Sequence, residues 1–197
     1  MSWKKAPLGD FMASRTGSVD PAQFPDETFE LFSIPAYDKN RAEIVRGSEI
    51  GSAKQVVSPG DVLLSRIVPH IRRAWVVNPA THYRLIGSGE WIPFRSPRIA
   101  PYFLRHLLIT DWFNAQLMRT VAGVGGSLLR ARPEGIARIE IPLPPLPEQR
   151  RIAAILDHAT PSALSAAPPS PNSTPSPSPS SSTCSATVRR TRVPGQR

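Results

Sequence analysis

The run IPLPPLPEQRRIAAILD at residues 141–157 constrains the fold of this chain more than any other stretch. Its four prolines fix the backbone φ angle and remove four N–H donors, so residues 141–146 are expected to be extended. Pro147 suits the first turn of a helix, where an N–H group has no partner in any case. Apolar residues then recur at helical spacing between Ile152 and Ala159. The pattern predicts a strap that leaves a folded domain and enters an amphipathic helix. Spacing alone is equally compatible with a plain junction between a domain and a linker.

Composition divides the 197 residues into three zones, 1–146, 147–159 and 160–197. The first zone holds every aromatic residue and is long enough to bury a real hydrophobic core. The second zone is the start of the helix that follows the strap. The third zone contains ten serines and eight prolines among its 38 residues. Such a segment cannot bury a core, so we expect it to be disordered.

The first zone predicts an α+β domain. Alternating or continuous apolar runs with turn residues between them predict short strands at 28–34, 62–67, 74–77, 83–86, 90–94 and 139–141. A helical stretch covers residues 101–121, and Thr110 or Asp111 is expected to divide it into two helices. Residues 133–137 suggest a further helical turn. Together these elements predict a curled, mixed or antiparallel sheet with one helical layer.

The charge favours a nucleic-acid partner. The formal net charge is +9, and arginines greatly outnumber lysines. Arginine is the side chain best suited to paired hydrogen bonds with phosphate or guanine. Cys184 is the single cysteine, which excludes an intrachain disulfide and fits a reducing cytoplasm. No apolar run is long enough for a signal peptide or a membrane span. Phosphate-binding, zinc-protease and nucleophile-elbow motifs are absent, so the residues favour a binding protein over an enzyme.

Four stretches of the chain resemble the specificity subunits of type I restriction–modification systems. The proline strap followed by Glu148-Gln149 is the most specific, and the run PGDVLLSR at 59–66 is moderately specific. Trp3 with Leu-Gly-Asp at 8–10 is similar to the family's opening, and residues 125–139 are similar to its approach to the strap. The resemblance covers about residues 1–159. It implies a single target-recognition domain that recognises DNA and has no catalytic activity of its own.

Two basic stretches are the candidate DNA contacts. The first, SRIVPHIRR at 65–73, follows the end of a predicted buried strand, and the second, GVGGSLLRAR at 123–132, combines glycines with hydroxyl and guanidinium donors. Solvated turns with stray charges remain the alternative in both places. The polar loop at 47–54 is compatible with a groove contact or with a linker between strands. The residues expected to contact DNA are Arg66, His70, Arg72, Arg73, Ser127, Arg130 and Arg132.

The resemblance also implies partners for the helix that begins at Pro147. In the family this helix continues for many turns and pairs antiparallel with a second such helix. The intact subunit docks methyltransferase (modification) subunits and, through the complex, the restriction subunit. S-adenosylmethionine, ATP and magnesium would belong to those partners, and this chain would bind no cofactor or metal. Two half-subunits could also pair as a homodimer. The expected subunit-interface residues are Gln149, Ile152, Ile155 and Leu156.

The third zone departs from the family pattern, and we expect the helix to stop near Ala159 and the spacer and second recognition domain to be absent. If suitable codons are assumed, translation of residues 160–174 in the frame shifted by one nucleotide gives ALRAERRAALAQLD. This sequence is rich in residues that favour helices. We therefore expect a one-nucleotide deletion there, which sequencing of the gene would test. A low-complexity linker or a proline-rich ligand are alternatives. The rival functional interpretation is a truncated subunit that binds only its methyltransferase partner or is a non-functional remnant.

Overall fold

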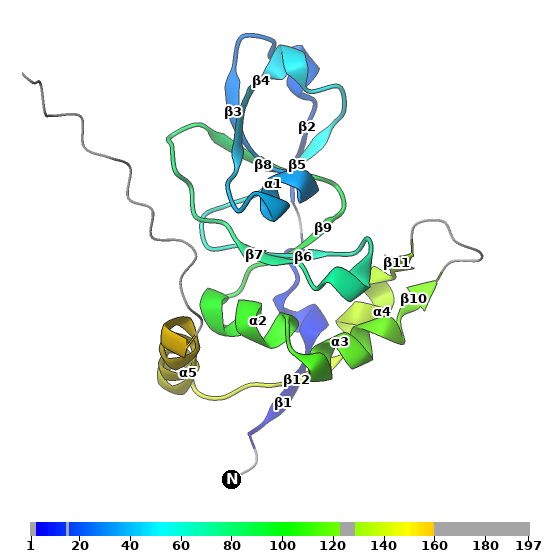
Figure 1. The fold of residues 1–197 in the computed structure, drawn as a ribbon, viewed down its shortest axis with the longest axis vertical. Helices are drawn as coiled ribbons and strands as arrows, with labels where there is room; N and C mark the ends of the chain where they lie inside the picture. Colours follow the sequence, from blue (N-terminus) through cyan, green and yellow to red (C-terminus); the bar gives the residue numbers. More distant parts are fainter. Residues whose placement is uncertain (1–2, 15, 123–128, 160–197) are drawn as a thin grey trace, which may run out of the picture. The chain divides into compact units, whose positions relative to one another are not determined.

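The structure is a computed structural model that describes residues 3–14, 16–122 and 129–159, and these residues form one compact unit (Figure 1). The expected α+β class is confirmed, but the strands are divided between two main sheets and two short pairs. The predicted disordered tail at 160–197 lies outside the described residues. The strands are β1 (Lys5–Pro7), β2 (Ser18–Val19), β3 (Thr28–Phe32), β4 (Glu43–Arg46), β5 (Lys54–Val56), β6 (Val62–Ser65), β7 (Ala74–Val76), β8 (Arg84–Gly87), β9 (Trp91–Phe94), β10 (Val121–Ala122), β11 (Arg130–Ala131) and β12 (Glu140–Pro142). The helices are η1 (Leu8–Phe11), η2 (Pro21–Gln23), α1 (Ile34–Asp38), η3 (Gly47–Glu49), η4 (Pro69–Ile71), α2 (Pro101–Leu108), α3 (Asp111–Met118), α4 (Pro133–Ala137) and α5 (Leu146–Ala159).

The larger sheet has five strands in the order β2-β5-β8-β3-β4. Strands β3 and β8 are parallel, whereas the other neighbours are antiparallel, so the sheet is mixed as expected. Its own core consists of Phe29 and Leu31 of β3 packed with Ile86 of β8, Ile50 and Val19 of β2. The polar loop at 47–54 connects β4 to β5, and its contact with a DNA groove stays a prediction.

Strand β6 is the centre of the smaller sheet, whose order is β7-β6-β9. Every residue of β6 is buried, because both faces of this sheet are covered. Val62 and Leu64 face the main core with α2, while Leu63 faces the aromatic side chains of Trp91 and Phe32. This alternation follows from the two-residue period of a strand. The small sheet is thus the layer between the five-stranded sheet and the helices (Figure 1).

The turn before β6 is fixed by a buried carboxylate. Asp61 is fully buried, and its Oδ2 accepts a hydrogen bond from the backbone N–H of Ser58 at 2.8 Å. Arg95 donates two hydrogen bonds to the same carboxylate at 2.6 and 2.7 Å, and this pairing raises the pKa of the arginine. Gly60 has φ +83°, a value that glycine adopts without a steric penalty. The predicted turn at 58–61 is therefore a rigid entry into the central strand.

The helical layer is formed by α2 and α3, which cover the small sheet. Thr110 caps α3, because its hydroxyl accepts a hydrogen bond from the backbone N–H of Phe113 at 3.2 Å. The predicted division of the long helical stretch at Thr110 is confirmed. Phe103, Leu104 and Phe113 belong to the main core. α2 packs against β6 and β7, and α3 packs against α2 and η4.

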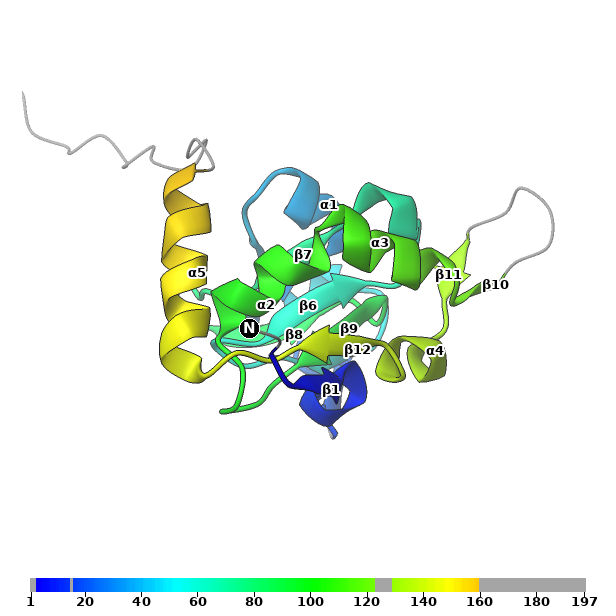
Figure 2. The same ribbon diagram turned by 90° about the horizontal axis from the view of Figure 1, so that it is seen from below.

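The proline strap closes the domain onto its own first strand. β12 pairs antiparallel with β1, and the register joins Ala6 to Ile141. The backbone N–H of Leu143 donates to the carbonyl oxygen of Lys4 at 2.8 Å and extends this pairing by one residue. Pro147 lies in the first turn of α5, as expected. The helix then packs beside α2 (Figure 2).

Candidate nucleic-acid interface

The structure brings together the two stretches that the sequence suggests for DNA contact. Ile67 and Arg130 form an isolated antiparallel β-bridge. The carbonyl oxygen of Arg66 accepts a hydrogen bond from the backbone N–H of Ala131 at 2.8 Å. The backbone N–H of Val68 donates to the carbonyl oxygen of Leu129 at 3.0 Å. The loop after β6 and the β11 side of the β10–β11 hairpin are therefore one connected surface.

The carboxylate of Glu90 pairs with arginines from both segments of this surface, and the sequence did not indicate this role. Its carboxylate accepts a hydrogen bond from Arg66 Nε at 2.9 Å and another from an Arg130 guanidinium nitrogen at 2.7 Å. The backbone N–H of Arg66 also donates to the carbonyl oxygen of Glu90. One carboxylate thus positions two predicted DNA contacts from different segments. Sequence separations of 24 and 40 residues leave no local pattern that predicts this arrangement.

The η4 turn between β6 and β7 is held in a strained conformation. Val68 has φ +46° and Arg72 has φ +38°, and these two residues flank the turn on either side. A β-branched residue in this region is a genuine outlier that costs on the order of 1–3 kcal/mol. The turn exposes His70 and leaves 46% of Ile71 accessible. Strained backbone that displays exposed side chains is frequent at binding sites.

Arg72 and Arg73 hold this turn in place. Arg72 contacts Asp111 at the start of α3, with 2.6 Å between guanidinium nitrogen and carboxylate oxygen. Arg73 donates two hydrogen bonds to Asp38 at 2.8 and 2.9 Å, and only 10% of its side chain is exposed. This paired hydrogen bonding raises the pKa of Arg73 and lowers the pKa of Asp38. Arg73 was expected to contact DNA, whereas the structure shows it anchoring the loop to α1.

Arg132 differs from the other candidate arginines in its surroundings. It is exposed and stands at the N-cap of α4. Within the described part of the chain it has no carboxylate partner, in contrast to Arg66, Arg72 and Arg130. Ser127 lies outside the described residues. His70 and Arg132 are therefore the predicted contacts that are exposed and carry no carboxylate partner.

The predicted subunit-interface residues differ in their surroundings. Gln149 is only 1% exposed, and its side chain bonds to the backbone of Ala100, Arg98 and Pro144. The expectation that Gln149 faces a partner is therefore corrected, because its polar atoms anchor α5 inside this chain. Ile152 packs partly against the main core. Ile155 is 55% exposed, and Leu156 is also exposed.

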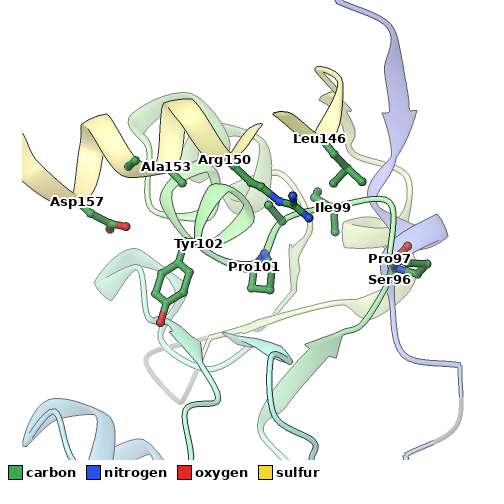
Figure 3. Close-up of a pocket in the computed structure, with 11 residues that line it drawn as sticks. Ser96, Pro97, Ile99, Pro101, Tyr102, Leu146, Arg150, Ala153 and Asp157 are labelled. Carbon is green, nitrogen blue, oxygen red and sulfur yellow. The ribbon is translucent and has the colours of Figure 1, made fainter. Parts of the chain in front are cut away.

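A second contact and a cavity lie along the same helix. His106 of α2 is buried, and its Nε2 lies 2.7 Å from a carboxylate oxygen of Asp157. A cavity of about 600 Å³ lies between α5 and the segment that leads into the start of α2 (Figure 3). Its walls are mainly apolar, and Arg150 and Asp157 are among the polar groups. In both views α5 lies on the opposite side of the domain from the β10–β11 hairpin (Figures 1 and 2). The two kinds of predicted site are thus spatially separate.

The described residues contain no group of three or more His, Cys, Asp or Glu side chains arranged to hold a metal ion. None of the helices in the described ranges is both long and apolar enough to cross a membrane.

The fold matches that of a known class of DNA specificity domains. The chain belongs to the type I restriction modification DNA specificity domain family, whose model matches residues 2–161. It is similar to the crystal structure of the HsdS subunit from Thermoanaerobacter tengcongensis, with 27% identity and a TM-score of 0.68. A second similar structure comes from work on complex assembly and conformational transition of the type I R-M system, with 28% identity and a TM-score of 0.67.

Each of these two comparisons covers 80% of this chain but 42% of the other chain. This chain therefore spans less than half the length of either relative. No curated protein matches it. The matched segment includes the strap and α5, so the resemblance seen in the sequence motifs extends over the whole described domain.

Proposed function

We propose that this chain recognises a DNA sequence as part of the specificity subunit of a type I restriction–modification complex. The observation that carries the proposal is the joining of two basic segments into one connected surface through the Ile67–Arg130 bridge and the shared carboxylate of Glu90. A surface whose backbone is fixed before binding loses less conformational entropy when DNA docks. Membership of the specificity-domain family supports the same function.

The structure suggests a division of roles among the basic residues. His70, Ile71 and Arg132 are exposed around the strained turn and the start of α4, and we assign them direct contact with DNA. Arg66 and Arg130 are held by Glu90, so they present only their remaining N–H groups. Arg72 and Arg73 position the loop. Phosphate contacts would fix the orientation of the domain, while contacts to base edges would provide specificity.

Methylation and cleavage would belong to partner subunits. We propose that methyltransferase subunits bind double-stranded DNA together with this domain and that the restriction subunit joins through them. S-adenosylmethionine, ATP and magnesium would then be bound by those partners. The exposed apolar side chains of Ile155 and Leu156 on α5 are the residues that we assign to subunit contact. A homodimer of two such chains is another arrangement compatible with this assignment.

Selection of bound oligonucleotides by the purified chain, with and without its methyltransferase partner, tests the proposal. A selected duplex should bind with an affinity that falls steeply with salt, by about 0.9 log units per log unit of salt for each phosphate contact. Replacement of Arg132 by alanine should weaken or broaden the selection. The matched control is Arg41→Ala, which removes an exposed arginine between α1 and β4 that has no ion pair within the described ranges. Binding that stays constant between low and moderate salt would contradict the proposal.

A second candidate function is binding of the methyltransferase partner without DNA recognition. The apolar cavity beside α5 and the exposure of Ile155 favour this candidate. A pull-down with the partner, combined with a DNA mobility shift assay, separates the two. Retention of the partner without any DNA shift would favour the second candidate.

A further inference from the structure

A second basic site adjoins the Glu90 surface, which is the surface formed by Arg66, Glu90 and Arg130. This site lies between α3, α4 and the β1–β12 pair. A cavity of about 420 Å³ is open there, and three of its wall residues are cationic: Lys5 of β1, Arg119 after α3 and Arg138 after α4. Figure 2 shows these elements lying beside one another. Within the described part of the chain, none of the three cations forms an ion pair. Glu140 is the carboxylate that lines the cavity with them, so the cavity carries an excess of positive charge.

One face of α3 forms a wall of the cavity. Trp112, Gln116 and Arg119 follow one another at spacings of four and three residues, which places them on one face of the helix. The side chain of Trp112 is 45% exposed. The amide oxygen of Gln116 lies 3.5 Å from a guanidinium nitrogen of Arg119. Proteins that bind nucleic acids commonly combine basic side chains, which contact the backbone, with exposed aromatic rings.

The cavity is continuous with the candidate DNA interface. Thr120 lines the cavity, and its carbonyl oxygen accepts a hydrogen bond from the backbone N–H of Arg132 at 3.2 Å. Gly135 of α4 packs against Thr120 so closely that an added Cβ atom would lie 2.8 Å from the threonine Cβ. The same short segment therefore carries Arg132 on one side and forms the cavity wall on the other. Because the two sites adjoin, the backbone of a DNA molecule bound at the first site is a better candidate for the occupant of the cavity than a separate small ligand is.

We propose that this cavity binds a phosphodiester of the DNA backbone, next to the bases that the Glu90 surface reads. Lys5, Arg119 and Arg138 bind the phosphate, and Trp112 packs against the adjoining sugar. The proposal rests on the proposed function, because it assumes that the domain binds duplex DNA. These contacts add affinity without sequence preference, since phosphate contacts carry no direct sequence information.

The test uses the full chain, a selected duplex and the double variant Arg119→Gln, Arg138→Gln. Both side chains are exposed, so glutamine removes the charges while the fold is retained, which a thermal melt checks. Each lost phosphate contact should lower the slope of log affinity against log salt by about 0.9. Because both arginines bind the same phosphate, the fall in affinity between 50 and 200 mM salt should then be roughly 3.5-fold smaller for the double variant than for the wild type. Arg41→Gln is the control that should leave the slope unchanged.

The outcomes separate this proposal from the proposed function. A lower slope with the same selected sequence supports the cavity as a phosphate site. An unchanged slope in a double variant that still selects its sequence overturns the cavity proposal alone. Failure of the wild-type chain to bind any duplex, with or without the methyltransferase partner, overturns both proposals. In a further experiment, inorganic phosphate and a nucleoside monophosphate are titrated into the wild type and into Trp112→Phe. The contribution of Trp112 to the tryptophan fluorescence is obtained from the difference between the two proteins. A response to these small anions with an unchanged DNA slope identifies a small-anion site and also overturns the proposal.

Discussion

Replacement of Gln149 by methionine tests how α5 is attached to the domain. The side-chain amide accepts a hydrogen bond from the Ala100 N–H at 2.7 Å and donates to the carbonyl oxygens of Pro144 at 2.8 Å and Arg98 at 3.2 Å. One residue thus joins the end of the strap to the start of α2. Methionine has a similar length and flexibility, so it fills the site without making these bonds.

The expected loss of stability follows from the groups left behind. The Ala100 N–H and the Pro144 carbonyl are buried, and an unsatisfied buried polar group costs about 1–3 kcal/mol. The bond to Arg98 is only partly buried and adds less. The free energy of unfolding should therefore fall by about 3 kcal/mol. For a domain of this size, such a loss lowers Tm by roughly 6–12 °C.

Urea unfolding followed by far-ultraviolet circular dichroism measures this loss, with Gln23→Met as the control because Gln23 is an exposed glutamine on η2. Gln149→Glu supplies a second measurement. A carboxylate cannot donate to the two carbonyls, whereas its protonated form has one O–H donor. The loss in that variant should therefore shrink as the pH falls. A change below about 1 kcal/mol for Gln149→Met would show that water replaces the amide and that the reasoning is wrong.

Three further predictions concern other contacts. The hydrogen bond from Arg73 lowers the pKa of Asp38 below its usual 3.8, so the folded state binds fewer protons than the unfolded state in this range. The pair stabilises the domain above about pH 4, and this contribution is lost as the pH falls through the lowered pKa; Asp38→Asn should flatten that part of a stability–pH curve. Gly47→Ala should destabilise the domain by about 2–4 kcal/mol, because the new Cβ would overlap the carbonyl oxygen of Phe24. Thermal unfolding measures this loss, and an unchanged Tm would contradict the prediction. Glu90→Gln removes the carboxylate shared by two arginines, so duplex binding should strengthen at low salt and depend more steeply on salt; a titration that matches the wild type would argue against DNA contact by those arginines.

The elements with strong local signals were predicted well. β6 lies within the expected strand because a turn and a continuous apolar run mark its start. The break between α2 and α3 falls at Thr110 because a capping hydroxyl is a local property of the sequence. α5 begins next to Pro147 for the same kind of reason. Chemistry confined to a few neighbouring residues was sufficient for these assignments.

The elements that depend on distant partners were missed. β1 and β4 are short, and their exposed side chains give no clear alternation with hydrophobic residues. Their strand geometry comes from pairing with β12 and β3. The division of the strands into two sheets likewise depends on which strands meet, and no local pattern records it.

The candidate site shows the same contrast. The sequence identified both basic stretches as candidates. It did not show that Glu90 forms ion pairs with both Arg66 and Arg130. Nor did it show that Arg73 forms an ion pair with Asp38. A carboxylate opposite an arginine is indistinguishable in sequence from any other solvated acid. Gln149 was assigned to an interface because the family resemblance implies that its helix takes part in assembly, yet its side chain is buried against backbone groups of this chain. Side-chain partners set by tertiary structure were therefore the main source of error.

The pairing of β1 with β12 has a consequence for biosynthesis. Lys5 meets Pro142, so the first strand emerges from the ribosome long before its partner has been translated. At about 5–20 residues per second, synthesis of the intervening segment of roughly 137 residues takes on the order of 10 s. During this time β1 has no hydrogen-bonding strand beside it, although the five-stranded sheet is already complete once β8 has been made. A nascent chain stalled before Glu140 should therefore hold a folded sheet beside an unpaired N-terminal segment that proteases can cleave.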